Sequence, residues 1–437
     1  MTKPSSTLAR KVPFFYGWLI VVSMFAAGMA SAGPTLWALS VFAIPMTDDL
    51  EWTRATFFGA LAARQLLMGA LAPIFGRLAD TEKWPRILMV FGGSTYALSL
   101  VLLSQISNQI QYFLVLSVLG GIGQASGGGI LRQAIVAKWF IRRRGRAIAI
   151  GSMGTGMAAF VYPLFAYVLI ESYGWRSAWI WMGVSSFLLL VPLALLVRRQ
   201  PEDIGLLPDG ETEVEAKARR VRAEQGDVSA AEEHSFTLAE VSKSRTLWLI
   251  VLATMITAPS MQGLTSTWVP YFQDIGFSAG VSATALTTYG LFSVLSRIVW
   301  GFIVEKYHVR KVIMANGTLI ALMVLVLINV QMITSALEVQ PALVVMIFAA
   351  FLGIIFGGFV GLNPLLWPNY FGRKFIGSIR GTFMPFITVS SALGPLWINY
   401  IFDRTGEYNL AYIILMVTWL IFVGLMFLAK PMAPPKN

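Results

Sequence analysis

The sequence predicts an all-α membrane protein with twelve transmembrane helices in two pseudo-symmetric six-helix bundles, and three observations support this fold class. Hydrophobic residues make up 56% of the 437 residues and charged residues only 13%, whereas soluble domains carry about 25% charged residues. About twelve apolar segments approach the ~20 residues needed to cross a bilayer. The basic residues also lie overwhelmingly on one side of these segments.

The predicted helices follow one another through mostly short connections. They span residues 14–41, 52–77, 86–105, 111–137, 145–170, 176–197, 246–271, 281–303, 311–333, 341–368, 376–401 and 409–429. Pro364, Pro368, Pro385 and Pro395 interrupt the apolar pattern at 341–401. We interpret them as kinks, because transmembrane helices tolerate proline.

The distribution of Lys and Arg predicts the orientation. With a cytoplasmic N-terminus, 27 basic residues lie on the cytoplasmic side, three lie outside and three lie within the apolar segments. The external three are Arg54, Arg176 and Arg404. The positive-inside rule therefore predicts a multi-pass protein of the cell membrane with both termini in the cytoplasm.

One long polar stretch, 198–244, separates the two sets of six apolar segments. The predicted organisation is thus an N-terminal bundle at 1–197, a cytoplasmic linker at 198–244 and a C-terminal bundle at 245–437. The net charge of +11 is spread along one membrane face. We interpret it as a topology signal beside anionic lipid, and we expect no nucleic-acid partner.

The composition also argues against catalysis. The chain has no cysteine, and its two histidines, His234 and His308, lie in connections between the apolar segments. Disulfides, iron–sulfur clusters and thiol chemistry are therefore excluded, and we expect neither an enzyme nor a metal or other cofactor.

Three arginines lie inside apolar segments, whereas none of the 22 acidic residues does. They are Arg64, Arg132 and Arg297. A charge in the bilayer is costly without a partner, so we interpret the missing partner as an anionic substrate. Arg297 is the strongest candidate, because a guanidinium stays protonated and matches a carboxylate with two parallel hydrogen bonds. Ser293 and Tyr289 lie one and two turns earlier on the same helical face.

The other two arginines differ in their predicted depth. Arg64 lies about twelve residues, or ~18 Å, from both ends of its segment, too deep to reach either surface easily. We interpret it as a substrate or gating contact, or as a structural arginine paired with carbonyl groups. Arg132 precedes Lys138 by six residues, ~9 Å. Its side chain is expected to reach the cytoplasmic headgroups; alternatively, it attracts anions into an inward-facing cavity.

Glycines and aromatic residues complete the candidate site. The glycines at 120–129 and at 353–361 predict close helix packing. Asn363-Pro364 predicts a local helix break that exposes polar backbone to the cavity. Trp37 and Trp367 are expected to form apolar walls or gates around the anion, with packing against neighbouring helices as the alternative.

A loop motif is repeated in the two halves. Gly76 and Asp80 are followed by Arg86, and Gly301 and Glu305 are followed by Arg310. The glycine permits close helix approach, and the acid is expected to pair with a nearby base across the loop. Such pairs would stabilise one gating state.

These duplicated halves and loops resemble the major facilitator superfamily. Trp139-Phe140-Ile141-Arg142-Arg143-Arg144-Gly145-Arg146-Ala147, leading into Gly151-Ser152-Met153-Gly154-Thr155-Gly156, is similar to the helix 5 signature of its monocarboxylate transporter and oxalate–formate antiporter branch. Ser296-Arg297-Ile298-Val299-Trp300-Gly301 resembles the helix 8 segment whose arginine binds the substrate carboxylate. Ser293 stands where proton-coupled members often have Asp, and Phe15-Tyr16-Gly17-Trp18 matches the helix 1 signature only in part.

The expected function is secondary transport of a small organic anion, a mono- or dicarboxylate, by alternating access in a monomer. Coupling is expected through exchange with a counter-anion or through a proton that travels with the substrate. A drug or metabolite exporter is one alternative, although export of apolar drugs or cations calls for an in-membrane acid. A transport-like receptor is another, which would bind without flux.

Overall fold

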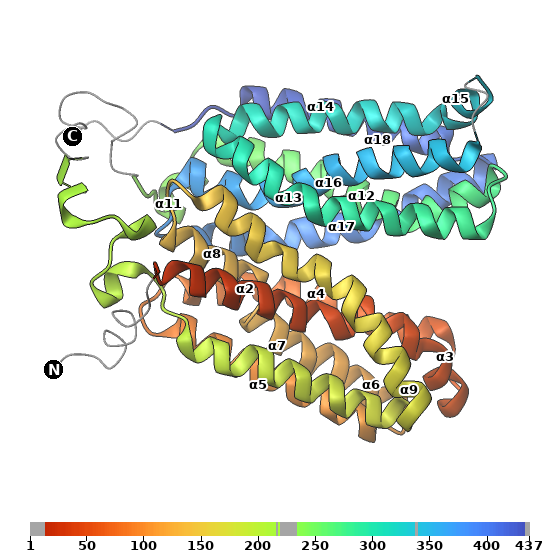
Figure 1. Cartoon of the computed structure of the whole chain (residues 1–437), viewed down its shortest axis with the longest axis horizontal. Helices are drawn as coiled ribbons and strands as arrows, with labels where there is room; N and C mark the ends of the chain where they lie inside the picture. Colours follow the sequence, from red (N-terminus) through yellow and green to blue (C-terminus); the bar gives the residue numbers. More distant parts are fainter. Residues whose placement is uncertain (1–13, 216, 219–233, 337–339, 433–437) are drawn as a thin grey trace. The chain divides into compact units, whose positions relative to one another are not determined.

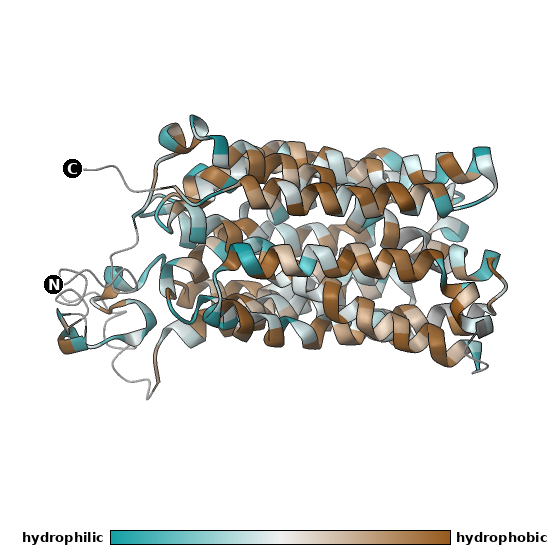
Figure 2. Cartoon of the chain, turned by 90° about the horizontal axis from the view of Figure 1, so that it is seen from above, coloured by the Kyte–Doolittle hydropathy of each residue, from teal (hydrophilic) through white to brown (hydrophobic). Residues whose placement is uncertain are grey.

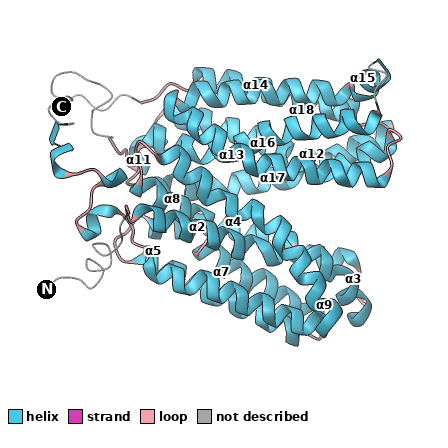
Figure 3. Ribbon diagram, in the orientation of Figure 1, coloured by secondary structure: helices cyan, strands magenta, loops and turns pink. Residues whose placement is uncertain are grey.

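A computed structural model describes residues 14–215, 217–218, 234–336 and 340–432, and these residues contain helices and loops but no strand (Figure 3). Within them, 11 helices are long and apolar enough to cross a membrane. One of these, α9, contains two of the predicted spans. The helical prediction is therefore confirmed over the described chain.

The first span continues further than predicted. It consists of α2 (Gly17–Ala32), a π-helical segment (Gly33–Trp37) and α3 (Leu39–Leu50), so the helical path passes residue 41. It ends where Glu51 takes a left-handed conformation with φ of 55°. The next spans are α4 (Arg54–Ala79) and α5 (Trp84–Leu102), which a 3-10 turn (Leu103–Gln105) extends.

The fourth span is broken near its middle. Its pieces are α6 (Gln109–Tyr112), a π-helical segment (Phe113–Leu119), α7 (Gly120–Ser126) and α8 (Gly129–Trp139). Gly127 and Gly128 separate α7 from α8, and Gly128 has an extended backbone. A new helix N-terminus therefore begins inside an apolar segment.

The fifth and sixth spans form α9 (Arg144–Leu196), which turns at Gly174. The backbone of Gly174 has φ of 78° and ψ of 162°, a conformation almost restricted to glycine. This turn accounts for the two predicted helices at 145–170 and 176–197.

The predicted linker at 198–244 contains short described elements. They are 3-10 turns at Pro201–Ile204 and Pro208–Gly210, and α11 (Leu238–Ser242). Residues 216 and 219–233 of this linker lie outside the described residues.

The described residues of the C-terminal half form seven further helices. They are α12 (Arg245–Asp274), α13 (Ala279–Lys306), α14 (Val309–Ile328), α15 (Val330–Ala336), α16 (Pro341–Phe371), α17 (Ile376–Thr405) and α18 (Asn409–Leu428). The predicted break at Asn363-Pro364 is wrong, since α16 is helical from end to end. Proline lacks one donor, but neighbouring groups in a membrane protein can satisfy the freed carbonyl.

The chain divides into two compact units (Figure 1). One contains the residues up to Leu238 together with Trp367–Met384, and the other contains Ala239–Leu366 and the residues from Pro385 onward. The boundary after Leu238 falls within the polar stretch at 198–244. The end of α16 and the start of α17 are grouped with the N-terminal half.

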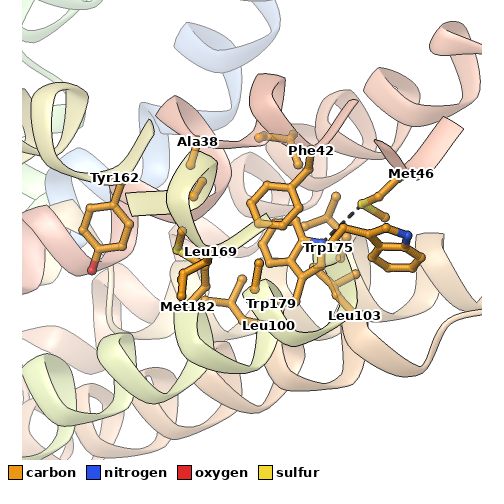
Figure 4. Packing of buried hydrophobic residues seen from close by; sticks show 14 of the residues in the cluster. Ala38, Phe42, Met46, Leu100, Leu103, Tyr162, Leu169, Trp175, Trp179 and Met182 are labelled. Atoms are coloured by element: carbon orange, nitrogen blue, oxygen red, sulfur yellow. Dashed lines mark hydrogen bonds between the residues drawn. The ribbon is translucent and has the colours of Figure 1, made fainter. Parts of the chain in front are cut away.

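Aromatic packing forms much of the N-terminal core (Figure 4). The Phe42 and Trp179 rings stack with centroids 4.0 Å apart, and Trp179 Nε1 donates to Met46 Sδ at 3.2 Å. A Cβ at Gly154 would overlap the carbonyl of Phe25, so glycine lets α9 pack directly on the α2 backbone. These contacts fix α2 and α3 beside α9.

Hydrophobic residues occur along all of the long described helices (Figure 2). Large hydrophobic side chains are exposed along several helices, including Leu164 at 65%, Leu188 at 61% and Phe427 at 63%. Such broad exposure of apolar side chains marks a surface that another apolar phase covers. With the helix lengths, it identifies a multi-pass membrane protein.

Glycine packing joins α13 to α16 in the C-terminal half. A Cβ at Gly353 would lie 3.1 Å from Tyr289 Cα, and one at Gly357 would lie 2.6 Å from Ser293 Cα. One at Gly361 would lie 3.8 Å from Arg297 Cβ. The predicted close packing is confirmed for Gly353 and Gly357, which bring α16 against the face of α13 that carries the candidate residues.

Replacing Gly357 by Ala is expected to destabilise the protein, because the added methyl group overlaps the backbone of α13. The expected loss is about 1–3 kcal/mol, as for other overpacked sites. Thermal unfolding followed by tryptophan fluorescence measures it. Gly424 in α18 is the matched control, since nothing lies within 4 Å of its Cβ position. Gly424→Ala should leave the Tm unchanged or raise it, because alanine favours helix; equal losses would contradict the packing argument.

Candidate functional site

A cavity of about 200 Å³ lies within the N-terminal half. It is lined by Ser31, Ala32, Leu36, Arg64, Gln65, Met68, Gln124, Gly128, Gly129, Arg132 and Thr155. Two of the three predicted arginines therefore share one cavity, and none of the described residues that line it is acidic.

Arg64 is almost completely buried, with 2% of its surface exposed. Its Nη2 donates to the carbonyl of Thr35 over 3.5 Å, which is the outer limit of a hydrogen bond. Nε and Nη1 are also buried, and neither has a hydrogen-bond partner among the described residues. Arg64 thus has two buried donor atoms, Nε and Nη1, that no described residue satisfies.

Arg132 is also buried, at 8% exposure. Its Nη1 donates to the carbonyl of Gly127 at 3.1 Å, and its Nη2 donates to Ser31 Oγ at 3.1 Å. The predicted path of this side chain to the headgroups is wrong. The helix begins again at Gly129, so Arg132 lies in the first turn of α8 and its guanidinium lies against α2 rather than at a surface.

Polar groups of α2, α5, α7 and the π-helical segment at Gly33–Trp37 form hydrogen bonds in the same region. Tyr96 Oη donates to the carbonyl of Ser31 at 3.0 Å and lies 3.0 Å from Thr35 Oγ1. Gln124 Nε2 donates to the carbonyl of Ser31 at 2.5 Å. These contacts gather at the π-helical end of α2, where the backbone bonding is irregular, a feature common at functional sites.

Trp37 lies beside this cavity rather than in its lining. Its indole Nε1 donates to the carbonyl of Thr155 at 2.9 Å, and Thr155 lines the cavity. The indole is 40% exposed. The bond links the end of the π-helical segment to α9.

The remaining candidates lie on α13 and α16. Arg297 and Ser293 are each 7% exposed, and Tyr289 is partly buried on the same face of α13. The amide Nδ2 of Asn363 is buried and has no hydrogen-bond partner among the described residues. Trp367 is buried at 2% exposure and packs near Phe371, with ring centroids 6.4 Å apart. Trp367 is grouped with the N-terminal unit, apart from the other four.

The first copy of the loop motif binds the start of α17. Asp80 accepts a hydrogen bond from Lys138 Nζ at 3.1 Å. It also accepts from the backbone N–H groups of Gly377 at 3.1 Å and Ser378 at 2.6 Å. A Cβ at Gly76 would overlap the Gly377 carbonyl, which explains the glycine. Asp80 therefore pairs with a lysine from another helix and with a helix N-terminus, not with a base of its own loop.

The basic members of the motif have different surroundings. Arg86 is exposed near the start of α5. Arg310 donates from Nε to the Met426 carbonyl at 3.0 Å and from Nη2 to the Phe427 carbonyl. It thereby binds the C-terminal end of α18, where a cation is favoured. Gly301 is buried and Glu305 lies in the last turn of α13.

Two contacts at the ends of helices could not be predicted from the sequence. Asp209 accepts bonds from the backbone N–H groups of Ile141, Arg142 and Arg143 at 2.8–3.1 Å. Arg380, only four residues into α17, donates to Gln133 Oε1 of α8. The sequence gives no signal for its partner.

The helix 1 and helix 5 signatures also pack on one another. The Tyr16 and Trp139 ring centroids lie 5.6 Å apart, and those of Trp18 and Phe140 lie 5.1 Å apart. Tyr16 Oη donates to the Leu196 carbonyl at 2.7 Å. This aromatic cluster anchors the start of α2 to the loop before α9.

Apolar membrane-spanning helices around a small internal cavity with buried cations define a polytopic membrane transport protein. The chain belongs to the Major Facilitator Superfamily, whose family model matches residues 18–395. It is a transporter rather than an enzyme.

Similar proteins confirm the narrower resemblance. Monocarboxylate transporter 12-B of Danio rerio is 22% identical over 414 residues, which cover 91% of this chain and 83% of that protein. The oxalate:formate antiporter of Oxalobacter formigenes is 24% identical over 407 residues, which cover 91% of this chain and 88% of that protein.

Solved structures confirm the fold. The human organic anion transporter MFSD10 superposes with a TM-score of 0.64 at 14% identity, covering 94% of this chain and 98% of that one. The proton:xylose symporter XylE gives a TM-score of 0.69 at 11% identity, covering 94% and 95%. Because one of these proteins is an organic anion transporter and the other a sugar symporter, the shared fold does not select a substrate.

Proposed function

We propose that this transporter moves a small organic anion, a mono- or dicarboxylate, by alternating access. One observation carries the proposal: Arg64 and Arg132 are buried around one cavity, and within the described structure no acidic residue lines it. Two cations in a region of low dielectric constant are costly without negative charge nearby. An anion that enters the cavity would supply it.

Arg297 is proposed to bind the substrate carboxylate from the C-terminal half. It is buried on α13, and Ser293 lies one turn away on the same face. The named substrates of the similar transporters, a monocarboxylate in one and oxalate and formate in the other, agree in charge with this assignment. Tyr289 and Asn363 are proposed to contribute polar contacts, and Trp37 and Trp367 apolar ones.

The coupling and the topology are also proposed. Exchange of one anion for another would resemble the antiporter, and a proton could instead travel with the substrate. We place the protein in the cell membrane as a monomer with both termini in the cytoplasm, since this orientation puts most Lys and Arg inside.

Uptake into liposomes that contain the purified protein tests the proposal. Labelled monocarboxylates and dicarboxylates are offered with and without an internal counter-anion. We expect saturable uptake of at least one anion. Dependence on the internal anion would indicate exchange, and acceleration by an inward proton gradient would indicate symport.

A neutral sugar and an organic cation serve as control substrates. Uptake of either one, with no uptake of any anion, would refute an anion transporter and favour another substrate class. Saturable anion binding without uptake would instead indicate a receptor.

A further inference from the structure

The cavity in the N-terminal half combines three features that favour negative charge. Two guanidinium groups line it, and Arg64 has two buried nitrogen atoms without a partner among the described residues. Gly128 and Gly129, where α8 begins, line the same cavity. α8 has 11 residues, so its N-terminus belongs to a helix of several turns rather than to a single turn.

The start of α8 contributes backbone donors. The first N–H groups of a helix have no carbonyl one turn earlier to bind, and the helix dipole places partial positive charge at this end. At Gly129 nothing lies within 4 Å of the Cβ position. The glycine therefore leaves open space at the helix start, unlike Gly123 of the same span, whose Cβ position lies 2.6 Å from the backbone nitrogen of Tyr96.

Size and charge then limit the ligand. The cavity of about 200 Å³ is below the ~300–1,000 Å³ of sites for drug-sized ligands. The two guanidinium groups carry two full positive charges, the helix N-terminus adds a partial one, and no described lining residue is acidic. A ligand with two negative charges balances them better than a ligand with one. A compact ligand with two negative charges fits both limits.

We propose that Arg64, Arg132 and the N-terminus of α8 form a site for a compact divalent oxyanion within the N-terminal half. Arg64 supplies free guanidinium donors, and Arg132 is held by Ser31 Oγ and the Gly127 carbonyl with its charge at the cavity. This proposal specifies that the ligand carries two negative charges. It rests on the proposed function only in that the transported ligand is an anion. A short dicarboxylate and an inorganic dianion share this chemistry.

Isothermal titration calorimetry of the purified full-length protein tests the site, with malonate, sulfate and lactate at constant ionic strength. Malonate and sulfate represent the two sources of a dianion, and lactate is the singly charged comparison. Arg64→Gln and Arg132→Gln should each weaken the binding of malonate, of sulfate or of both by about 10- to 100-fold, as expected for a lost bond to a charged group. Lactate should lose less than threefold.

Two matched pairs separate the site from a folding defect. Arg64→Lys keeps the charge and should retain part of the affinity that Arg64→Gln loses. Gly129→Pro removes the first N–H of α8 at a position where proline is tolerated, whereas Gly129→Ala keeps it. The affinity for the dianion should fall several-fold more in Gly129→Pro than in Gly129→Ala. If the two variants have equal affinities, the N-terminus of α8 does not contribute to the site.

The outcomes also separate this site from the proposed function. Equal losses for malonate, sulfate and lactate in Arg64→Gln and Arg132→Gln, or no loss at all, would overturn the dianion site while anion uptake into liposomes still stands. Suppose instead that no organic anion is taken up but sulfate binds and both arginines are needed for that binding. This result would refute organic anion transport and would still support the dianion site.

Discussion

Replacing Arg297 by Gln is expected to reduce anion uptake by on the order of 100-fold while the protein still folds. Loss of a buried partner of a charged group costs about 2–5 kcal/mol, and each 1.4 kcal/mol is a factor of ten. Gln keeps polarity and much of the side-chain length but removes the charge and the planar fork. Initial uptake rates in liposomes, normalised to the amount of inserted protein, measure the loss.

Arg297→Lys is the informative companion, because it keeps the charge without bidentate geometry. We expect an intermediate rate. Arg404→Gln removes an exposed arginine near the end of α17 and should transport like the unmodified protein. If Arg297→Gln is monodisperse in size-exclusion chromatography and transports at the unmodified rate, Arg297 does not bind the substrate.

The sequence predicted the helices well, because a membrane-spanning helix must be long and apolar wherever it lies. Prediction from the sequence was wrong where one residue type can have two structural roles. Glycine permits both close packing and a helix end, so the run at 120–129 was interpreted as packing throughout. Gly123 does pack against α5, but Gly128 and Gly129 lie at the start of α8 and line the cavity. Conversely, Asn363-Pro364 suggested a break that the continuous α16 does not have.

Depth along a helix could also be predicted, but side-chain direction could not. Arg132 lies close to the end of its span, yet its guanidinium reaches Ser31 on α2. The partners of Asp80 lie 58 residues away at Lys138 and 297 residues away at Gly377. Pairing over such separations depends on tertiary packing, whereas the loop pattern alone predicts pairing with a nearby base.

The Asp80 contacts predict the second large effect, on stability. Asp80→Ala is expected to lower the free energy of unfolding by about 3 kcal/mol or more, since removing one partner of a buried ion pair leaves an uncompensated charge. The side chains of Lys138 and Asp80 are only 3% and 6% exposed. The N–H groups of Gly377 and Ser378 would also lose their acceptor. A lower Tm by tryptophan fluorescence, without added ligand, is the measurement.

A double variant distinguishes the buried charge from the bonds to α17. Asp80→Asn combined with Lys138→Met removes both charges but keeps a side-chain carbonyl for the backbone N–H groups of α17. If the unpaired lysine causes most of the loss, the double variant should recover more than half of the stability that Asp80→Ala loses. If it is as unstable as Asp80→Ala, the negative charge on the N-terminus of α17 matters more than the lysine, as the helix dipole allows. A Tm for Asp80→Ala equal to that of the unmodified protein would contradict both explanations.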